Sequence, residues 1–109
     1  MSYDVIVTES AQRDLAGIFE YIALALLEPE TAVNLYRGIM NAIHTLDTFP
    51  ERNPIVEIEP WRKAGMRKMP VKNYIVFYDI AGGAVRVLRI MYHARDIEKR
   101  LAEPPADKS

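Results

Sequence analysis

The stretch Tyr74-Ile75-Val76-Phe77-Tyr78-Asp79-Ile80-Ala81-Gly82-Gly83-Ala84-Val85-Arg86-Val87 decides the fold of this chain. It opens with a continuous apolar and aromatic run, which suits a central strand covered on both faces. The Gly82-Gly83 pair that follows is typical of a tight two-residue hairpin turn. A second apolar segment then runs from Val85 to Met91. The stretch therefore predicts two paired antiparallel strands, at residues 73–80 and 84–91.

Two helices are predicted upstream of this hairpin. Residues 3–7 place apolar side chains at every second position, which indicates a short first strand. Apolar side chains then recur at the spacing of an amphipathic helix, first over residues 8–26 and again over 30–48. Pro29 separates the two runs, because proline disfavours helical geometry in the preceding residue and suits the start of a new helix. So short a break indicates an antiparallel helical hairpin.

The remaining segments complete the expected architecture. Residues 50–64 form a proline-containing connector that has room for a brief edge strand, and residues 65–71 form a further strand. Residues 96–101 are expected to form a short last helix and residues 103–109 a flexible tail. The order predicts an α+β fold, in which an N-terminal strand and an antiparallel helical hairpin pack on a mainly antiparallel four-stranded sheet. We expect one domain over residues 1–102.

Composition sets the broad class of the protein. With 109 residues, half of them hydrophobic and 27% charged, the chain has the balance of one globular domain. It has no apolar run long enough to span a membrane and no signal peptide, so we expect a soluble protein of the cytoplasm. The absence of cysteine excludes disulfides, thiol nucleophiles and cysteine-based metal sites.

Charge is distributed unevenly along the chain. Residues 1–59 hold three basic and ten acidic side chains, whereas residues 60–100 hold ten basic and three acidic ones. Such asymmetry predicts a basic functional half that faces an anionic partner. The alternative is that the two halves attract each other within one fold, since net charge concerns association and not topology.

Four segments, at residues 7–23, 46–50, 65–78 and 87–96, resemble in this order the RelE/ParE superfamily of bacterial toxins. The first helix of ParE-type members is similar to residues 7–23, and the end of their second helix to Leu46-Asp47-Thr48-Phe49-Pro50. Residues 65–78 resemble the strand pair of the family. Val87-Leu88-Arg89-Ile90-Met91-Tyr92-His93-Ala94-Arg95-Asp96 resembles its C-terminal strand and the segment after it. The match spans roughly residues 3–101.

The resemblance implies the toxin of a type II toxin–antitoxin system, which inhibits growth until a co-encoded antitoxin neutralises it. RelE-like members cut messenger RNA on the ribosome without a metal, whereas ParE-like members are described as poisons of DNA gyrase. The long helical hairpin favours the ParE-like side. Tyr74 also stands where RelE-like members commonly carry an arginine. The resemblance therefore leaves the RelE-like ribonuclease as the alternative.

Metal-free RNA cleavage would require a general acid or base and cations for the charge that grows on the phosphate. His93 is the candidate acid or base, because it follows the strand that carries Arg89. Arg67 and Arg89 are the candidate cations. Each has a structural alternative: a solvated strand edge for Arg67, an ion pair with Asp79 or Asp96 for Arg89, and a hydrogen-bonded strand end for His93.

Other side chains are candidates for contact with a nucleic acid or a protein target. An aromatic residue between cations can stack on bases or anchor a partner, and a tyrosine can stack or fill the core. These candidates are Trp61, Arg62, Lys63, Lys68, Tyr74 and Arg95. His44 and His93 are isolated from each other, so we expect no metal and no cofactor. The antitoxin is expected to bind the basic half and an apolar groove beside the helical hairpin or the outer strand.

Overall fold

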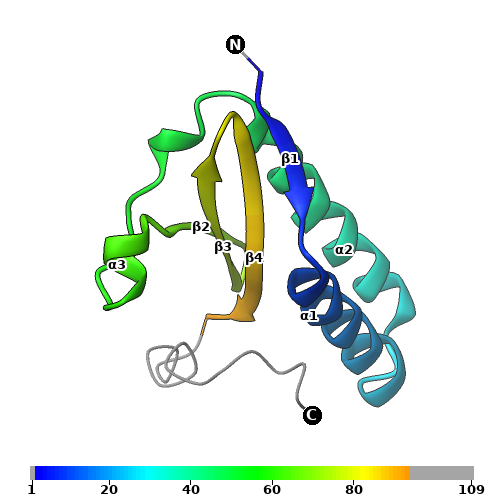
Figure 1. Cartoon of the computed structure of the whole chain (residues 1–109). Coiled ribbons are helices and arrows are strands. Elements are labelled where there is room, and N and C mark those ends of the chain that lie inside the picture. Colours follow the sequence, from blue (N-terminus) through cyan, green and yellow to red (C-terminus); the bar gives the residue numbers. More distant parts are fainter. Residues whose placement is uncertain (1, 94–109) are drawn as a thin grey trace.

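The computed structural model describes residues 2–93 (Figure 1). A four-stranded sheet lies between a helical hairpin on one face and an irregular connector on the other. The elements in chain order are β1 (Asp4–Val7), α1 (Glu9–Glu20), α2 (Pro29–His44), α3 (Trp61–Ala64), β2 (Arg67–Val71), β3 (Tyr74–Ala81) and β4 (Ala84–Tyr92). Within this part of the chain, every helix is too short or too polar to cross a membrane.

The sheet has the strand order β1-β4-β3-β2. Strands β2, β3 and β4 pair in antiparallel fashion, and Gly82 and Gly83 turn the chain between β3 and β4 at positive φ angles of 58° and 82°. Strand β1 pairs with β4 in parallel, from Asp4 opposite Ala84 to Val7 opposite Val87. The predicted α+β fold with a mainly antiparallel sheet is confirmed.

The helical hairpin is also confirmed, although its helices end earlier than predicted. Helix α1 stops at Glu20 and gives way to a π-helical turn over Tyr21–Ala25, after which Leu27 has a left-handed φ of 57°. Helix α2 begins at Pro29 and stops at His44 rather than residue 48. A 3₁₀ turn over Thr45–Asp47 follows α2. Both extensions carry apolar residues at helical spacing, so periodicity alone did not mark the ends.

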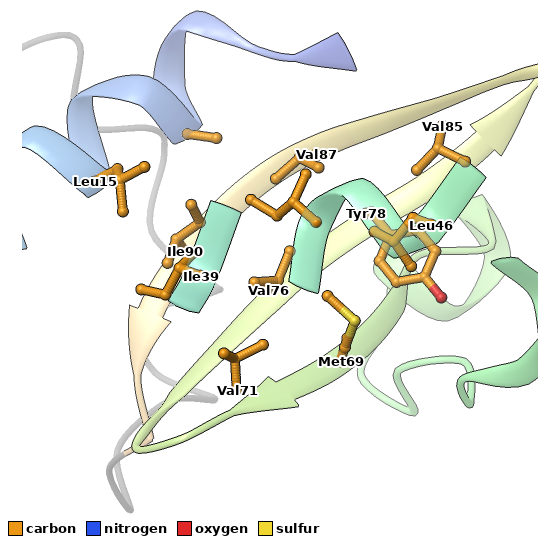
Figure 2. Close-up of a cluster of buried hydrophobic side chains, with 12 residues drawn as sticks. Leu15, Ile39, Leu46, Met69, Val71, Val76, Tyr78, Val85, Val87 and Ile90 are labelled. Atoms are coloured by element: carbon orange, nitrogen blue, oxygen red, sulfur yellow. The ribbon is translucent and has the colours of Figure 1, made fainter. Parts of the chain in front are cut away.

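The main core lies between the helical hairpin and the sheet. Figure 2 shows Leu15 from α1 and Ile39 from α2 facing Val76 and Val87 of the central strands. Tyr78 is fully buried in the same cluster. Inward-facing residues come from every third or fourth position of the helices and alternate positions of the strands, as burial of one face of each element requires.

A second cluster lies on the opposite face of the sheet. Val56 from the connector packs there with Met66, Ile75, Phe77 and Met91, while Trp61 of α3 lies at its margin. The connector holds a short helix that the sequence did not predict. Its edge pairing is limited to a bridge between Ile55 and Arg67. The predicted helix at 96–101 and the tail at 103–109 lie outside the described residues.

Candidate functional site

Arg89 and Asp14 form the central ion pair of the site. The carboxylate of Asp14 accepts hydrogen bonds from Nε of Arg89 at 2.8 Å and from Nη2 at 3.1 Å. It also accepts the backbone N–H of Ile90 at 2.9 Å. Hydrogen bonding with Asp14 raises the pKa of the Arg89 guanidinium above its ordinary value. The charge of Arg89 is therefore already engaged inside the protein.

These contacts also explain how α1 is placed on the sheet. Strand β1 pairs with β4 only as far as Val87, so β4 has an uncovered edge beyond that point. Thr8 begins the cover, because its N–H and its hydroxyl both donate to the carbonyl of Val87, at 3.1 Å and 2.7 Å. Asp14, six residues further along the chain, binds the next uncovered N–H of this edge, that of Ile90. Helix α1 thus satisfies backbone groups that β1 is too short to reach.

Arg67 has a different environment at the start of β2. Its Nη1 donates to the backbone carbonyls of Glu51 at 3.1 Å and Asn53 at 2.6 Å. Beside it, the buried hydroxyl of Tyr78 donates to the carbonyl of Pro50 at 2.6 Å and accepts from Nδ2 of Asn53 at 3.0 Å. Burial raises the pKa of this hydroxyl. Arg67 and Tyr78 together hold the connector against the sheet.

The structure does not bring the three candidate catalytic residues into one cleft. Arg67 stands opposite Tyr78, whereas the other end of β2 lies beside Tyr74, which pairs with Tyr92. The exposed His93 follows Tyr92, and its backbone N–H donates to the carbonyl of Asn73. Four residues of strand separate the two ends, about 13 Å at the rise of a β-strand. Arg89 lies in β4 and faces Asp14 of α1.

The candidate target-binding residues are dispersed as well. Trp61 is partly buried against the second cluster, and Arg62 pairs with Glu59 at 2.6 Å. Lys63 and Lys68 are exposed and make no ion pair with any described residue. Arg95 lies outside the described residues. Within residues 2–93, no three His, Asp or Glu side chains gather in a way that could hold a metal ion.

Tyr74 belongs to a groove that runs between α1 and the end of β4. Its ring meets that of Tyr92 edge-on, with 5.5 Å between centroids and 75° between planes, and burial raises the pKa of its hydroxyl. The groove has a volume of about 730 Å³. The lining residues are Arg13, Asp14, Gly17, Ile18, Tyr21, Ile22, Leu26, Tyr74, Arg89, Ile90, Met91 and Tyr92. We call it the tyrosine groove; ion-paired charges lie in it beside apolar and aromatic walls.

Gly17 leaves the backbone of α1 bare inside the tyrosine groove. A Cβ built there would have no heavy atom within 4 Å, so neither crowding nor an unusual φ requires glycine. Glycine within a helix is destabilising relative to alanine. The residue therefore costs stability in the free protein while it keeps the groove open to a closely approaching chain.

Several groove residues were not predicted from the sequence, above all Asp14, Gly17, Tyr21 and Tyr92. One signal was available for two of them. Asp14, Ile18 and Tyr21 follow one another at helical spacing, so they lie on one face of α1 and of the π-helical turn that continues it. No such signal links Asp14 to β4, since that contact depends on how the helix packs on the sheet.

Comparisons with known proteins bear on this site. A family model described as the ParE toxin of the type II toxin–antitoxin system parDE matches residues 5–97. None of the curated proteins matches the chain in sequence. A structure of the chromosomal ParDE system from P. aeruginosa is similar, with a TM-score of 0.72 and 18% identity over 85% of this chain and 98% of that one.

A second similar structure is the RelBE2 toxin–antitoxin complex from Mycobacterium tuberculosis. It gives a TM-score of 0.59 and 21% identity over 84% of this chain and 99% of that one. At these identities the two structures show a shared fold. The family model, which covers most of the chain, shows the family.

Proposed function

This chain belongs to the ParE toxin family of type II toxin–antitoxin systems, and from that premise we propose that it inhibits growth by binding DNA gyrase in the cytoplasm rather than by cutting RNA. The observation that supports this choice is the engagement of the candidate catalytic cations. Arg89 is bound by Asp14, and Arg67 is bound by two backbone carbonyls. The charge of Arg89 is thus neutralised by a carboxylate, and Nη1 of Arg67 serves to hold the connector.

The position of His93 gives further support. A general acid and its stabilising cations must converge on one reacting phosphate, within hydrogen-bonding reach of it. Arg67 and His93 lie at opposite ends of β2 and β3 instead. A protein that acts by binding needs no such convergence, and the surface carries a groove of charged, apolar and aromatic residues that can receive a protein segment.

A direct assay tests this proposal. Purified toxin is expected to inhibit supercoiling by DNA gyrase and to leave messenger RNA intact on translating ribosomes. His93→Gln removes the imidazole at an exposed position, so inhibition and growth arrest are expected to be unchanged. Ribosome-dependent cleavage of messenger RNA that His93→Gln abolishes would establish the RelE-like alternative instead.

We also propose that the co-encoded antitoxin lies in the tyrosine groove. The groove lies beside the helical hairpin, and Gly17 lets a bound chain approach the backbone of α1 closely. Aromatic walls that are half exposed in the free toxin suit burial against a partner. The Arg13 side chain pairs only at 3.6 Å with the exposed Glu9, so it can turn toward a carboxylate of the antitoxin.

A substitution at Gly17 tests the groove. Gly17→Leu fills the groove from a helix position that favours leucine, so the toxin is expected to fold normally and to bind the antitoxin at least tenfold more weakly. Titration calorimetry with the co-purified antitoxin measures the affinity. Asn41→Leu, at an exposed position of α2 outside the groove, is the control. Equal affinities for wild type and Gly17→Leu would place the antitoxin elsewhere.

A further inference from the structure

The tip of the helical hairpin exposes two leucines that nothing in the described structure covers. Leu24 has 71% of its surface exposed and Leu27 has 79%. Tyr21 and Leu26 beside them are 59% and 51% exposed, and these two also line the end of the tyrosine groove. Figure 1 shows that the tip, between α1 and α2, projects beyond the end of β4. Clustered exposed apolar side chains mark interaction sites.

The backbone of the tip is strained where it presents Leu27. The chain leaves α1 through a π-helical turn, in which the N–H of Leu26 donates to the carbonyl of Tyr21 at 3.0 Å. Leu27 then takes a φ of 57°. This conformation is common for glycine and asparagine but costs free energy for a leucine. Since the side chain is mostly exposed, burial within the free toxin does not compensate for that cost.

The charge around the tip restricts the possible partner. Residues 20–31, which include both leucines, contain three exposed carboxylates, on Glu20, Glu28 and Glu30, and no lysine or arginine. An acidic surface repels nucleic acid phosphates, and it also repels a second copy of itself. The complementary partner is therefore a protein surface with an apolar cleft and a basic rim.

We propose that Leu24 and Leu27, which we call the leucine tip, insert into such a basic-rimmed cleft on the protein target that the toxin inhibits. The inference rests on the proposed function, in which the toxin acts by binding a protein. The leucine tip does not line the tyrosine groove, but Tyr21 and Leu26 adjoin both surfaces. An antitoxin seated in the groove therefore covers the margin of the tip and sterically excludes the target.

The test separates binding of the target from binding of the antitoxin. In the double variant Leu24→Gln, Leu27→Asn, the asparagine accepts the left-handed conformation and the glutamine suits a helical turn, so the fold is retained. We expect an unchanged or higher Tm, an antitoxin Kd within threefold of wild type, and at least tenfold weaker growth arrest and gyrase inhibition. Glu20→Lys and Glu30→Lys reverse the charge beside the tip. Each is expected to weaken growth arrest and gyrase inhibition as well.

Phe49→Asn is the matched control. Phe49 is also 63% exposed and has a left-handed φ of 47°, but it follows α2 at the other end of the hairpin. Its replacement is expected to leave growth arrest unchanged. If the double variant arrests growth as wild type does, or loses the antitoxin along with toxicity, the assignment is wrong. If wild type spares gyrase while the double variant loses growth arrest and keeps the antitoxin, the leucine tip stands and gyrase is replaced as the target.

Discussion

Asp14 shows how one side chain can join two distant parts of the chain. It binds the guanidinium of Arg89 and the N–H of Ile90, which lie 75 and 76 residues away in sequence. Sequence reasoning anticipated an ion pair for Arg89 but offered Asp79 or Asp96 as its partner. Asp79 pairs with Arg86 instead, directly across β3 and β4. Alternation along a strand is readable from sequence, whereas the rotation of α1 against the sheet is not.

Removal of the Asp14 carboxylate is expected to destabilise the fold. Asp14→Ala leaves a partly buried guanidinium and a backbone N–H without their acceptor, so the free energy of unfolding should fall by about 2–4 kcal/mol. Urea denaturation measures the change. Arg13→Gln breaks the exposed pair with Glu9 and should cost less than about 0.5 kcal/mol. Similar losses for the two variants would contradict the structural role of Asp14.

The Tyr78 hydroxyl is a second group whose contribution to the free energy of unfolding can be measured separately. Tyr78→Phe leaves the carbonyl of Pro50 and the side-chain amide of Asn53 without this partner, at an expected cost of about 1–3 kcal/mol. The exposed Tyr92 makes no hydrogen bond through its hydroxyl with any described residue, so Tyr92→Phe should change stability by less than about 0.5 kcal/mol. Thermal unfolding of the two variants makes the comparison.

The same hydroxyl predicts a dependence of stability on pH. Burial raises the pKa of Tyr78 above its ordinary value of 10.0, because the charged phenolate is disfavoured in the core. The contribution of the neutral Tyr78 hydroxyl to the free energy of unfolding is therefore fully present below about pH 10. It is lost as the pH rises through the higher pKa of the folded state. Tyr78→Phe should flatten the fall in unfolding free energy between about pH 9 and 11. An unaltered slope would mean that another group controls alkaline unfolding.

At the scale of elements, sequence pattern predicted types well and ends poorly. Gly82 and Gly83 identified the hairpin turn, since only a turn explains two adjacent glycines between apolar runs. Helix α1 was predicted to reach residue 26, because Ile22 and Leu26 continue its apolar spacing. The parallel pairing of β1 with β4 was not specified by sequence, because periodicity reports which face of a strand is buried and not its neighbour.

Replacement of the two glycines within the helices by alanine is expected to stabilise the protein by different amounts. Gly17→Ala meets no atom within 4 Å, so it should raise the free energy of unfolding by about 1 kcal/mol through helix propensity. At Gly38 a new Cβ would lie 2.9 Å from Cε of Lys72, whose flexible side chain must move aside. Gly38→Ala should therefore stabilise less. Denaturant titrations that rank the pair in reverse would show that helix α1 does not hold Gly17 in helical geometry.

At the scale of the whole molecule, part of the basic half of the chain is engaged in contacts within the fold. Arg62, Arg86 and Arg89 are in ion pairs, and Arg67 binds backbone carbonyls. Among residues 2–93, the Asp14–Arg89 pair is the one ion pair that joins distant segments of the acidic and basic halves. Both explanations of the uneven charge therefore hold in part. Attraction between the two halves accounts for the Asp14–Arg89 pair, and the exposed lysines remain available to an anionic partner.

This distribution predicts weak RNA binding with a small salt dependence. Each exposed lysine that contacts a phosphate contributes about −0.7 to the slope of log K against log salt for a single strand. Lys68→Gln should reduce the magnitude of the slope by about that amount, whereas Arg86→Gln should not, because Asp79 already neutralises Arg86. Fluorescence anisotropy with a short RNA measures both slopes. An equal reduction from both substitutions would show that Arg86 leaves Asp79 to bind phosphate.

The parallel pairing of β1 with β4 has a consequence during synthesis. Residues 4–7 pair with residues 84–87, so β1 cannot join the sheet until residue 87 has left the ribosome. The tyrosine groove, which uses both α1 and the end of β4, is likewise one of the last surfaces to form. A nascent or truncated chain thus lacks its finished binding surfaces. The sheet and the groove are thus completed at the same stage, and an antitoxin that binds the groove can bind only a molecule that has folded.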